Sequence, residues 1–195
     1  MKWGPLKRLD PRAPLVLDTR ELARRPGSSK RVSRTEPAPP DLRIELIGVP
    51  EGSPVQLDLL LESVMEGILA SGTARASLAG ECARCLDPVE DELVVELQEL
   101  YVYPESDARD DEASRLEGDY LDLEPVLRDA VVLALPFRPV CDDDCPGLCA
   151  ECGARLADEP AHHHAEPTDP RWAALASLTA DNTAGRDDAT GENEE

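Results

Sequence analysis

The sequence is poor in aromatic residues and contains no long apolar run. Aromatic residues make up only 3% of the chain, with two Trp and one Phe, so a core must be built from aliphatic side chains. No stretch of about 18 apolar residues occurs, which excludes an ordinary membrane-spanning helix. The N-terminus also lacks the apolar core of a secretory signal, so we expect a protein of a reducing cytoplasm.

Familiar catalytic motifs are also missing. The chain has no phosphate-binding loop of the form G-x4-G-K-[ST], no Ser-His-Asp motif and no H-E-x-x-H. Carboxylates are abundant, but nothing in a single sequence pairs any two of them. We therefore predict that the protein is not an enzyme and assign no catalytic or cofactor-binding residue. A metal-dependent hydrolase is the least favoured alternative.

What the sequence does contain is a dense cluster of cysteines. The segment 141–153 reads C-D-D-D-C-P-G-L-C-A-E-C-G. Several thiolates in a short loop rich in Gly and Pro are typical of a zinc site. The C-x2-C-G ending has the form of a zinc knuckle, because Gly lets the chain turn back toward the sulfurs. We predict one structural zinc ion bound by Cys141, Cys145, Cys149 and Cys152.

Other ligand sets and other uses of these cysteines remain open. The segment between two predicted strands carries a second C-x2-C pair, Cys82 and Cys85, and the histidine run 162–164 supplies imidazoles. Cys82, Cys85, His162 and His164 are therefore alternate ligands. Small buried thiols and disulfides are the competing interpretations. Interleaved acidic residues argue against the first, and a reducing compartment argues against the second.

Charge divides the chain into two parts. Residues 1–34 carry ten Lys and Arg against three acidic residues, whereas the remainder carries ten basic and 38 acidic residues. The whole chain has a formal charge of −21. Such a division favours two kinds of contact, in which a basic arm, 1–34, binds nucleic acid and an acidic body binds basic proteins. Acidity that only confers solubility is the simpler alternative.

Hydrophobic periodicity predicts an α+β fold, an antiparallel β-meander packed by one main helix. Alternating apolar residues predict strands over 42–46, 55–61, 68–78 and 89–103. Residues 122–135 have apolar positions at helical spacing, with Asp122 as the expected N-cap. A cysteine-rich, zinc-knuckle-like segment follows the helix, and a last short helix is expected over 171–178.

The remaining segments are expected to connect or flank this domain. We predict a flexible basic N-terminus over 1–14 and a domain over 15–178. Within that domain, Leu15–Leu17 suggests a short strand and Thr19 the cap of a short helix through Arg24. The Ser, Arg and Pro composition of 28–41 predicts a linker, and 104–118 an acidic loop. Residues 179–195 are expected to form a disordered acidic tail.

Five stretches together resemble one protein family, YceD, in its actinobacterial form with cysteines. They read V-L-D-T-R-E-L-A-R-R-P-G (16–27), C-A-R-C-L-D-P (82–88), D-L-E-P-V-L-R-D-A-V-V-L-A-L-P (122–136), C-P-G-L-C-A-E-C-G (145–153) and D-P-R-W (169–172). Cysteine-rich members often carry C-x-C where this chain has His162–His164, which favours the histidine alternative. Because not all members carry the cysteines, a metal would support the structure rather than define the activity.

The resemblance implies a non-catalytic ribosome-biogenesis factor of the bacterial cytoplasm. Such a factor supports the synthesis, processing or stability of 23S rRNA, the RNA of the large subunit. The implied partners are a basic large-subunit ribosomal protein, a pre-50S particle, or 23S rRNA contacted through the basic arm. The competing interpretation is a zinc-ribbon adaptor for transcription or other protein partners.

Overall fold

The computed structural model describes residues 9–22, 24–105 and 114–164. The chain divides into two compact units, Met1–Leu148 and Cys149–Glu195, and we describe each by itself. We call the first the body and the second the C-terminal unit. The expected helix over 171–178 and the expected acidic tail lie outside the described residues.

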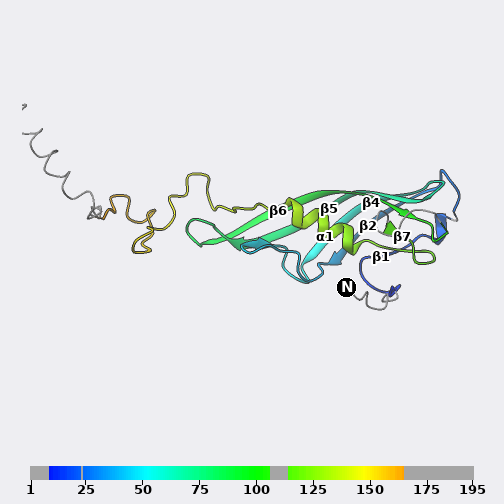
Figure 1. Ribbon diagram of the computed structural model, residues 1–195, viewed down its shortest axis with the longest axis horizontal. Coiled ribbons are helices and arrows are strands. Elements are labelled where there is room, and N and C mark those ends of the chain that lie inside the picture. Colours follow the sequence, from blue (N-terminus) through cyan, green and yellow to red (C-terminus); the bar gives the residue numbers. More distant parts are fainter. Residues whose placement is uncertain (1–8, 23, 106–113, 165–195) are drawn as a thin grey trace, which may run out of the picture. The chain divides into compact units, whose positions relative to one another are not determined.

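The body is built on a six-stranded, mostly antiparallel sheet with the strand order β2-β4-β5-β6-β7, in which β3 pairs with β5. Its long strands β4, β5 and β6 can be followed in Figure 1. A separate antiparallel pair is formed by β1 and β8. The elements are β1 Val16–Asp18, η1 Arg20–Leu22, β2 Ser29–Pro37, β3 Ile47–Gly48, β4 Pro54–Ser63, β5 Gly67–Glu81, β6 Pro88–Val102, β7 Ser114–Arg115, β8 Tyr120–Asp122 and α1 Glu124–Ala134. The predicted α+β class is confirmed.

Strict alternation of apolar and polar residues produces the three central strands. Along β4, Val55, Leu57, Leu59 and Leu61 are buried while the intervening side chains are largely exposed. The same alternation continues in β5 and β6, which are each 15 residues long and pair over their whole length. Because side chains of a strand point alternately to its two faces, one face of the sheet builds the core and the other faces solvent.

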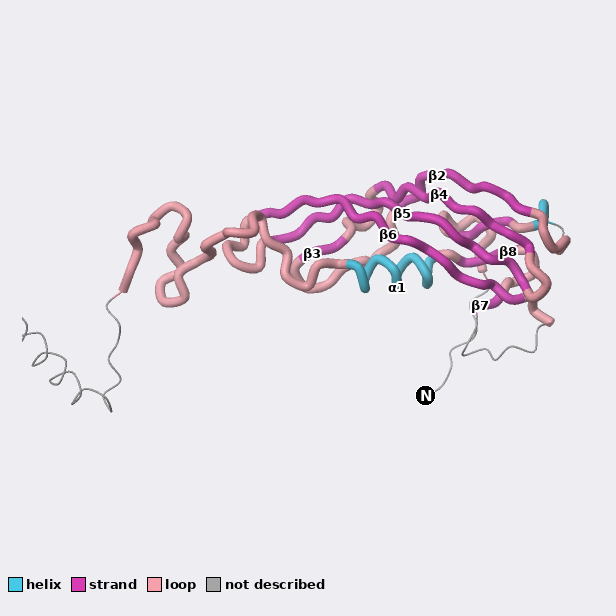
Figure 2. Tube along the Cα trace, turned by 90° about the horizontal axis from the view of Figure 1, so that it is seen from above, coloured by secondary structure: helices cyan, strands magenta, loops and turns pink. Residues whose placement is uncertain are grey.

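Helix α1 lies along the sheet beside β6 (Figure 2). It buries Leu127 and Val131, as the helical spacing predicts. The N-cap differs from the expected one, because Leu123 occupies that position and makes no side-chain cap. Asp122 stands one residue earlier, and its carboxylate accepts a hydrogen bond from the Glu124 amide at 3.0 Å. The acid therefore still satisfies one amide of the first turn.

The prediction of a linker over 28–41 is wrong. Residues 29–37 form β2, which pairs with β4 from Ser29 opposite Glu62 to Pro37 opposite Pro54. This strand is at the edge of the sheet and has no buried residue, only alternation of exposed and half-buried side chains. Edge strands are often polar or charged, since this discourages pairing with other chains. The polar composition of β2 therefore gave no sign of a strand in the sequence.

The predicted strand over 42–46 is also wrong. Apart from an isolated bridge between Arg43 and Gly48, pairing in this region belongs to Ile47–Gly48, which forms β3 against β5. Leu42 is buried as part of a loop rather than a strand. The antiparallel partners of β4 are β2 and β5. The chain between β2 and β4 supplies β3, which pairs with Ala79 and Gly80 of β5, beyond the residues of β5 that pair with β4.

The description of residues 1–34 as a separate basic arm needs correction. From residue 16 onward this region contributes β1, η1 and β2 to the body. Several of its cations meet acids there: Lys30 lies 3.1 Å from Glu21, and Arg24 lies 3.3 Å from Glu105. Thr19 precedes η1, a single turn of 3-10 helix rather than the longer helix expected. The first eight residues lie outside the described part.

The acidic loop predicted over 104–118 is described only at its two ends. Ser114–Arg115 forms β7, which pairs in parallel with β6. Residues 106–113 lie outside the described part. Among the described residues, α1 is the one α-helix, and none is long and apolar enough to cross a membrane.

Candidate metal centre

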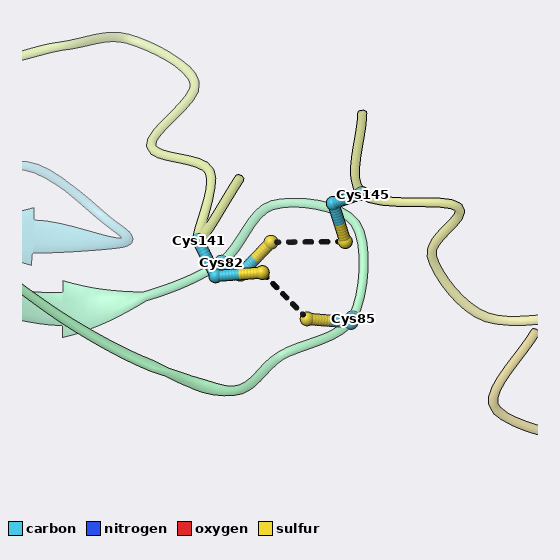
Figure 3. Close-up of side chains that lie close together, drawn as sticks. All are labelled: Cys82, Cys85, Cys141 and Cys145. Atoms are coloured by element: carbon cyan, nitrogen blue, oxygen red, sulfur yellow. Dashed lines mark hydrogen bonds between the residues drawn. The ribbon is translucent and has the colours of Figure 1, made fainter. Parts of the chain in front are cut away.

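Four cysteine side chains of the body converge at the tip of the β5–β6 hairpin. Cys82 and Cys85 lie in the turn, and Cys141 and Cys145 lie in the segment after α1 (Figure 3). The sulfur of Cys82 is 3.9 Å from that of Cys145, and the sulfur of Cys85 is 3.5 Å from that of Cys141. Thiolates bound to one zinc ion at about 2.3 Å in a tetrahedron lie about 3.8 Å apart. The group therefore fits a four-coordinate metal.

Local hydrogen bonds in the turn fix the position of Cys82. Its amide donates to the carbonyl of Asp87 at 2.7 Å, and its carbonyl accepts from the amide of Leu86 at 2.9 Å. Leu86 adopts a left-handed conformation with φ of 63°, which closes the turn. The Arg84 amide lies 3.4 Å from the Cys82 sulfur. An amide that faces a thiolate in this way stabilises the charged form of a metal ligand.

The segment after α1 is attached to the turn by the backbone. Ala83 donates an amide hydrogen bond to the carbonyl of Pro139 at 2.7 Å, and Leu148 donates one to the carbonyl of Arg84 at 3.1 Å. The Arg84 guanidinium in turn donates to the carbonyl of Cys145 at 2.9 Å. Cys82 is completely buried and Cys145 nearly so. The protein frame thus brings the four thiols together through contacts that do not involve sulfur.

Electrostatics favours one thiolate and disfavours its neighbours. Hydrogen bonds from the backbone amides of Cys85 and Arg84, opposed by burial, lower the pKa of Cys82 to about 6. The Asp87 contact acts to lower the pKa of Cys85, but burial and the neighbouring thiols outweigh it and raise that pKa to about 12. Once Cys82 is a thiolate, ionising a neighbouring thiol places a second negative charge beside it. A bound dication would compensate the repulsion between these charges. The group is therefore suited to holding a metal.

A second group of potential ligands lies within the C-terminal unit. Cys149, Cys152, His162 and His164 have their ligand atoms within 4.8 Å of one another. Hydrogen bonds from the amides of Cys152 and Glu151 lower the pKa of Cys149 to about 6. Gly153 has φ of 73° and donates its amide to the carbonyl of Cys149 at 2.9 Å, which is the turn expected of a knuckle.

The structure distributes the expected ligands differently from the single cluster that sequence spacing suggests. Cys141 and Cys145 belong to the body group, whereas Cys149 and Cys152 belong to the group in the C-terminal unit. The alternates complete both groups: Cys82 and Cys85 join the first pair, and His162 and His164 join the second. That a metal is bound, and that it is zinc, stays a prediction. The sequence analysis did not predict that Arg84 supports the cysteine group through its hydrogen bonds to Cys145 and Leu148. Its position between Cys82 and Cys85 was the one sequence feature that could have indicated this role.

Comparison with known proteins identifies a matching family. The family described as "Large ribosomal RNA subunit accumulation protein YceD" matches residues 70–179, more than half of the chain. The match begins within β5 and includes β6, α1 and all six cysteines.

Similar curated proteins come from mycobacteria. Uncharacterized proteins of Mycobacterium tuberculosis and Mycobacterium bovis are each 45% identical to this chain over 179 residues, which cover 90% of this chain and 86% of the relative. An uncharacterized protein of Mycobacterium leprae is 41% identical over 172 residues, which cover 86% of this chain and 79% of the relative. No solved structure matches the chain significantly.

Proposed function

Because this chain belongs to the YceD family, we propose that it is a non-catalytic ribosome-biogenesis factor that supports accumulation of 23S rRNA during large-subunit assembly. The family match over residues 70–179 is the observation that carries this proposal. The family description supports a ribosome-related role. The site of action is then the bacterial cytoplasm, where ribosomes assemble.

In this proposal the body cysteines bind a structural zinc ion. Cys82, Cys85, Cys141 and Cys145 form a closed set of four ligands, which leaves no open position for substrate. The ion would fasten the hairpin tip to the segment after α1. Its contribution would be to hold the shape of the tip rather than to perform a reaction.

The open face of the sheet is the surface that we assign to a basic partner. Glu90, Glu92 and Glu96 of β6 are exposed and lie opposite Ala79, Ser77 and Thr73 of β5. Thr73 of β5 lies between Glu96 on one neighbouring strand and Asp58 of β4 on the other, and Asp58 is also exposed. Arg75 pairs with Glu92 at 2.7 Å on the same face. The excess of acid favours a basic ribosomal protein over an RNA phosphate backbone.

The first experiment follows the ribosome. Depleting the protein in its host should lower the ratio of 23S to 16S rRNA, and the protein should sediment with large-subunit precursors in sucrose gradients. A zinc-ribbon adaptor for other partners predicts an unchanged ratio and a protein that stays in the light fractions. That result would overturn the proposal.

The second experiment tests the acidic face. Glu92→Lys combined with Glu96→Lys should weaken co-purification of basic large-subunit proteins at least tenfold, because two attractive charges become repulsive. Glu45→Lys with Glu51→Lys, two exposed acids of the loop between β2 and β4, makes the same change in net charge and is the matched control. If both pairs weaken binding equally, net charge rather than this face decides the interaction.

A further inference from the structure

The two histidines of the C-terminal unit are oriented as metal ligands. The Nε2 atoms of His162 and His164 lie 3.2 and 3.3 Å from the sulfur of Cys152 and 2.9 Å from each other. A tetrahedral zinc ion with bonds of about 2.0–2.1 Å to nitrogen holds two ring nitrogens about 3.3 Å apart. The observed spacing is within a few tenths of an ångström of that arrangement.

Each histidine also has a carboxylate on its other ring nitrogen. Nδ1 of His162 lies 3.0 Å from an oxygen of Glu159, and Nδ1 of His164 lies 3.3 Å from an oxygen of Glu151. Metal-binding histidines usually donate this second N–H to a carboxylate, which fixes the ring and makes the opposite nitrogen a better ligand. If Nδ1–H of each ring donates to its carboxylate, the Nε2 atoms that face each other at 2.9 Å are both acceptors, which is the form of histidine that binds a metal. A shared cation would be bound by both acceptors.

Little else in the described part of the unit holds it together. No residue of 149–164 is buried, and none belongs to a helix or strand. The backbone hydrogen bonds within these residues are local, such as that from Cys149 to Ala154 at 2.8 Å and that from His162 to Glu159 at 2.9 Å. A segment this short, with so little apolar burial, is typical of domains that depend on a metal to fold.

We propose that the C-terminal unit binds a zinc ion of its own through Cys149, Cys152, His162 and His164, so that the full chain carries two zinc ions. Two thiolates and two imidazoles in a closed tetrahedron suit zinc, whereas magnesium and calcium prefer oxygen ligands. All four positions are taken by protein, which makes this site structural. The proposal does not depend on a role in ribosome assembly.

The histidine run provides a matched control. His163 lies between the two ligands but its Nδ1 contacts the carbonyl of Ala161 at 2.9 Å, and it is not a member of the group. The full-length protein, purified without a polyhistidine tag, is analysed for zinc by mass spectrometry after gel filtration. The wild type should contain two zinc ions per chain, His164→Ala one and His163→Ala two. If the wild type holds one ion that survives His164→Ala, or if both variants lose zinc equally, the proposal is wrong.

Two further variants separate ligation from folding. His164→Cys supplies another zinc ligand and should keep two ions, while Glu151→Gln should keep the ligand and weaken the second ion about 10–100-fold in chelator competition. In the cobalt-substituted protein, Cys85→Ser should remove the absorption of the four-thiolate site and leave that of a mixed sulfur and nitrogen site. A spectrum of pure thiolate type in every variant would contradict the assignment.

Discussion

The body and the C-terminal unit are held together by different physical means. The body buries aliphatic side chains from nearly every element, including Leu22, Ile47, Leu57, Leu121 and Leu127. The described residues of the C-terminal unit bury none. Apolar burial stabilises the first through the hydrophobic effect, which grows with the area removed from water. In the second, convergent polar side chains take the place of a core.

The two groups of potential metal ligands differ in the same way. The thiols of the body group converge on a frame made by other contacts, such as the hydrogen bond from Ala83 to Pro139. In the C-terminal unit, by contrast, the four potential ligands are the main group of side chains that meet, and no buried apolar residue of 149–164 supports them. A ligand bound only by the folded form stabilises it, and the share of stability it provides is larger where little else does. Metal removal should therefore destabilise the C-terminal unit much more than the body.

The largest expected effect is that of metal removal on the C-terminal unit. A strong chelator should abolish amide-exchange protection over 149–164, since structural zinc supplies on the order of 10 kcal/mol in small zinc-folded peptides. The strands β4, β5 and β6 should keep their protection, with a local loss only at residues 82–87. Exchange measured by mass spectrometry checks both statements. Equal loss of protection in both regions would contradict the comparison.

The next effect belongs to the core of the body. Leu127 of α1 is completely buried, so Leu127→Ala should cost about 2–5 kcal/mol through lost burial and the cavity left behind. Leu133 of the same helix is 85% exposed, and Leu133→Ala should change stability by less than about 0.5 kcal/mol. Urea unfolding followed by circular dichroism measures both. Similar costs for the two variants would mean that the helix is packed differently.

A smaller effect is expected where the body holds its cysteines. Gly147 has φ of 79°, and a Cβ there would lie 3.0 Å from the carbonyl oxygen of Arg84. Gly147→Ala should cost about 1–3 kcal/mol through backbone strain and this contact. It should weaken zinc binding by the body about tenfold and leave the second ion unaffected. Chelator competition measures this.

The control for that variant is Gly52→Ala. Gly52 has φ of 75°, and a Cβ added there would meet no atom within 4 Å, so only backbone strain remains. Its stability cost should be about 1 kcal/mol, with no change in zinc affinity. Weaker zinc binding in both variants would show that general destabilisation, rather than the contact with Arg84, is responsible.

Local patterns predicted the elements that bury a continuous face. The alternation in β4, β5 and β6 and the spacing of Leu127 and Val131 follow directly from the periods of strand and helix. The edge strand β2 escaped because neither of its faces is buried, so its residues lack an apolar signal. For the same reason its Ser, Arg and Pro content was mistaken for a linker.

The ligand groups show where sequence distance misleads. Cys145 and Cys149 are four residues apart, yet they belong to different groups, whereas Cys82 and Cys145 are brought together across 63 positions. Cys82 and Cys145 can meet because the tip of the β5–β6 hairpin contacts the segment after α1. Spacing identifies which residues are ligand types, but the fold decides which of them share a site.

The smallest expected effect concerns surface charge on the body. Arg20 donates from Nε to both carboxylate oxygens of Asp18, at 3.0 and 2.9 Å, and this lowers the pKa of Asp18 to about 2. An unfolded aspartate has a pKa of about 3.9, so the stabilisation is complete above about pH 5 and is lost as the pH falls toward 2. Because both side chains are more than one-third exposed, we expect no more than about 0.5 kcal/mol.

Asp18→Asn should therefore lower the melting temperature slightly at pH 7, and wild type and variant should converge as the pH approaches 2–3. Arg20→Gln should reproduce the loss at pH 7, since it removes the other half of the same pair. Thermal denaturation across this pH range measures the difference. A gap that stays constant with pH would mean that Asp18 acts through packing, or as the side-chain acceptor of the Arg20 backbone amide, rather than through its charge. A small, pH-dependent effect would instead show that this surface ion pair adds little to a body held by its aliphatic core.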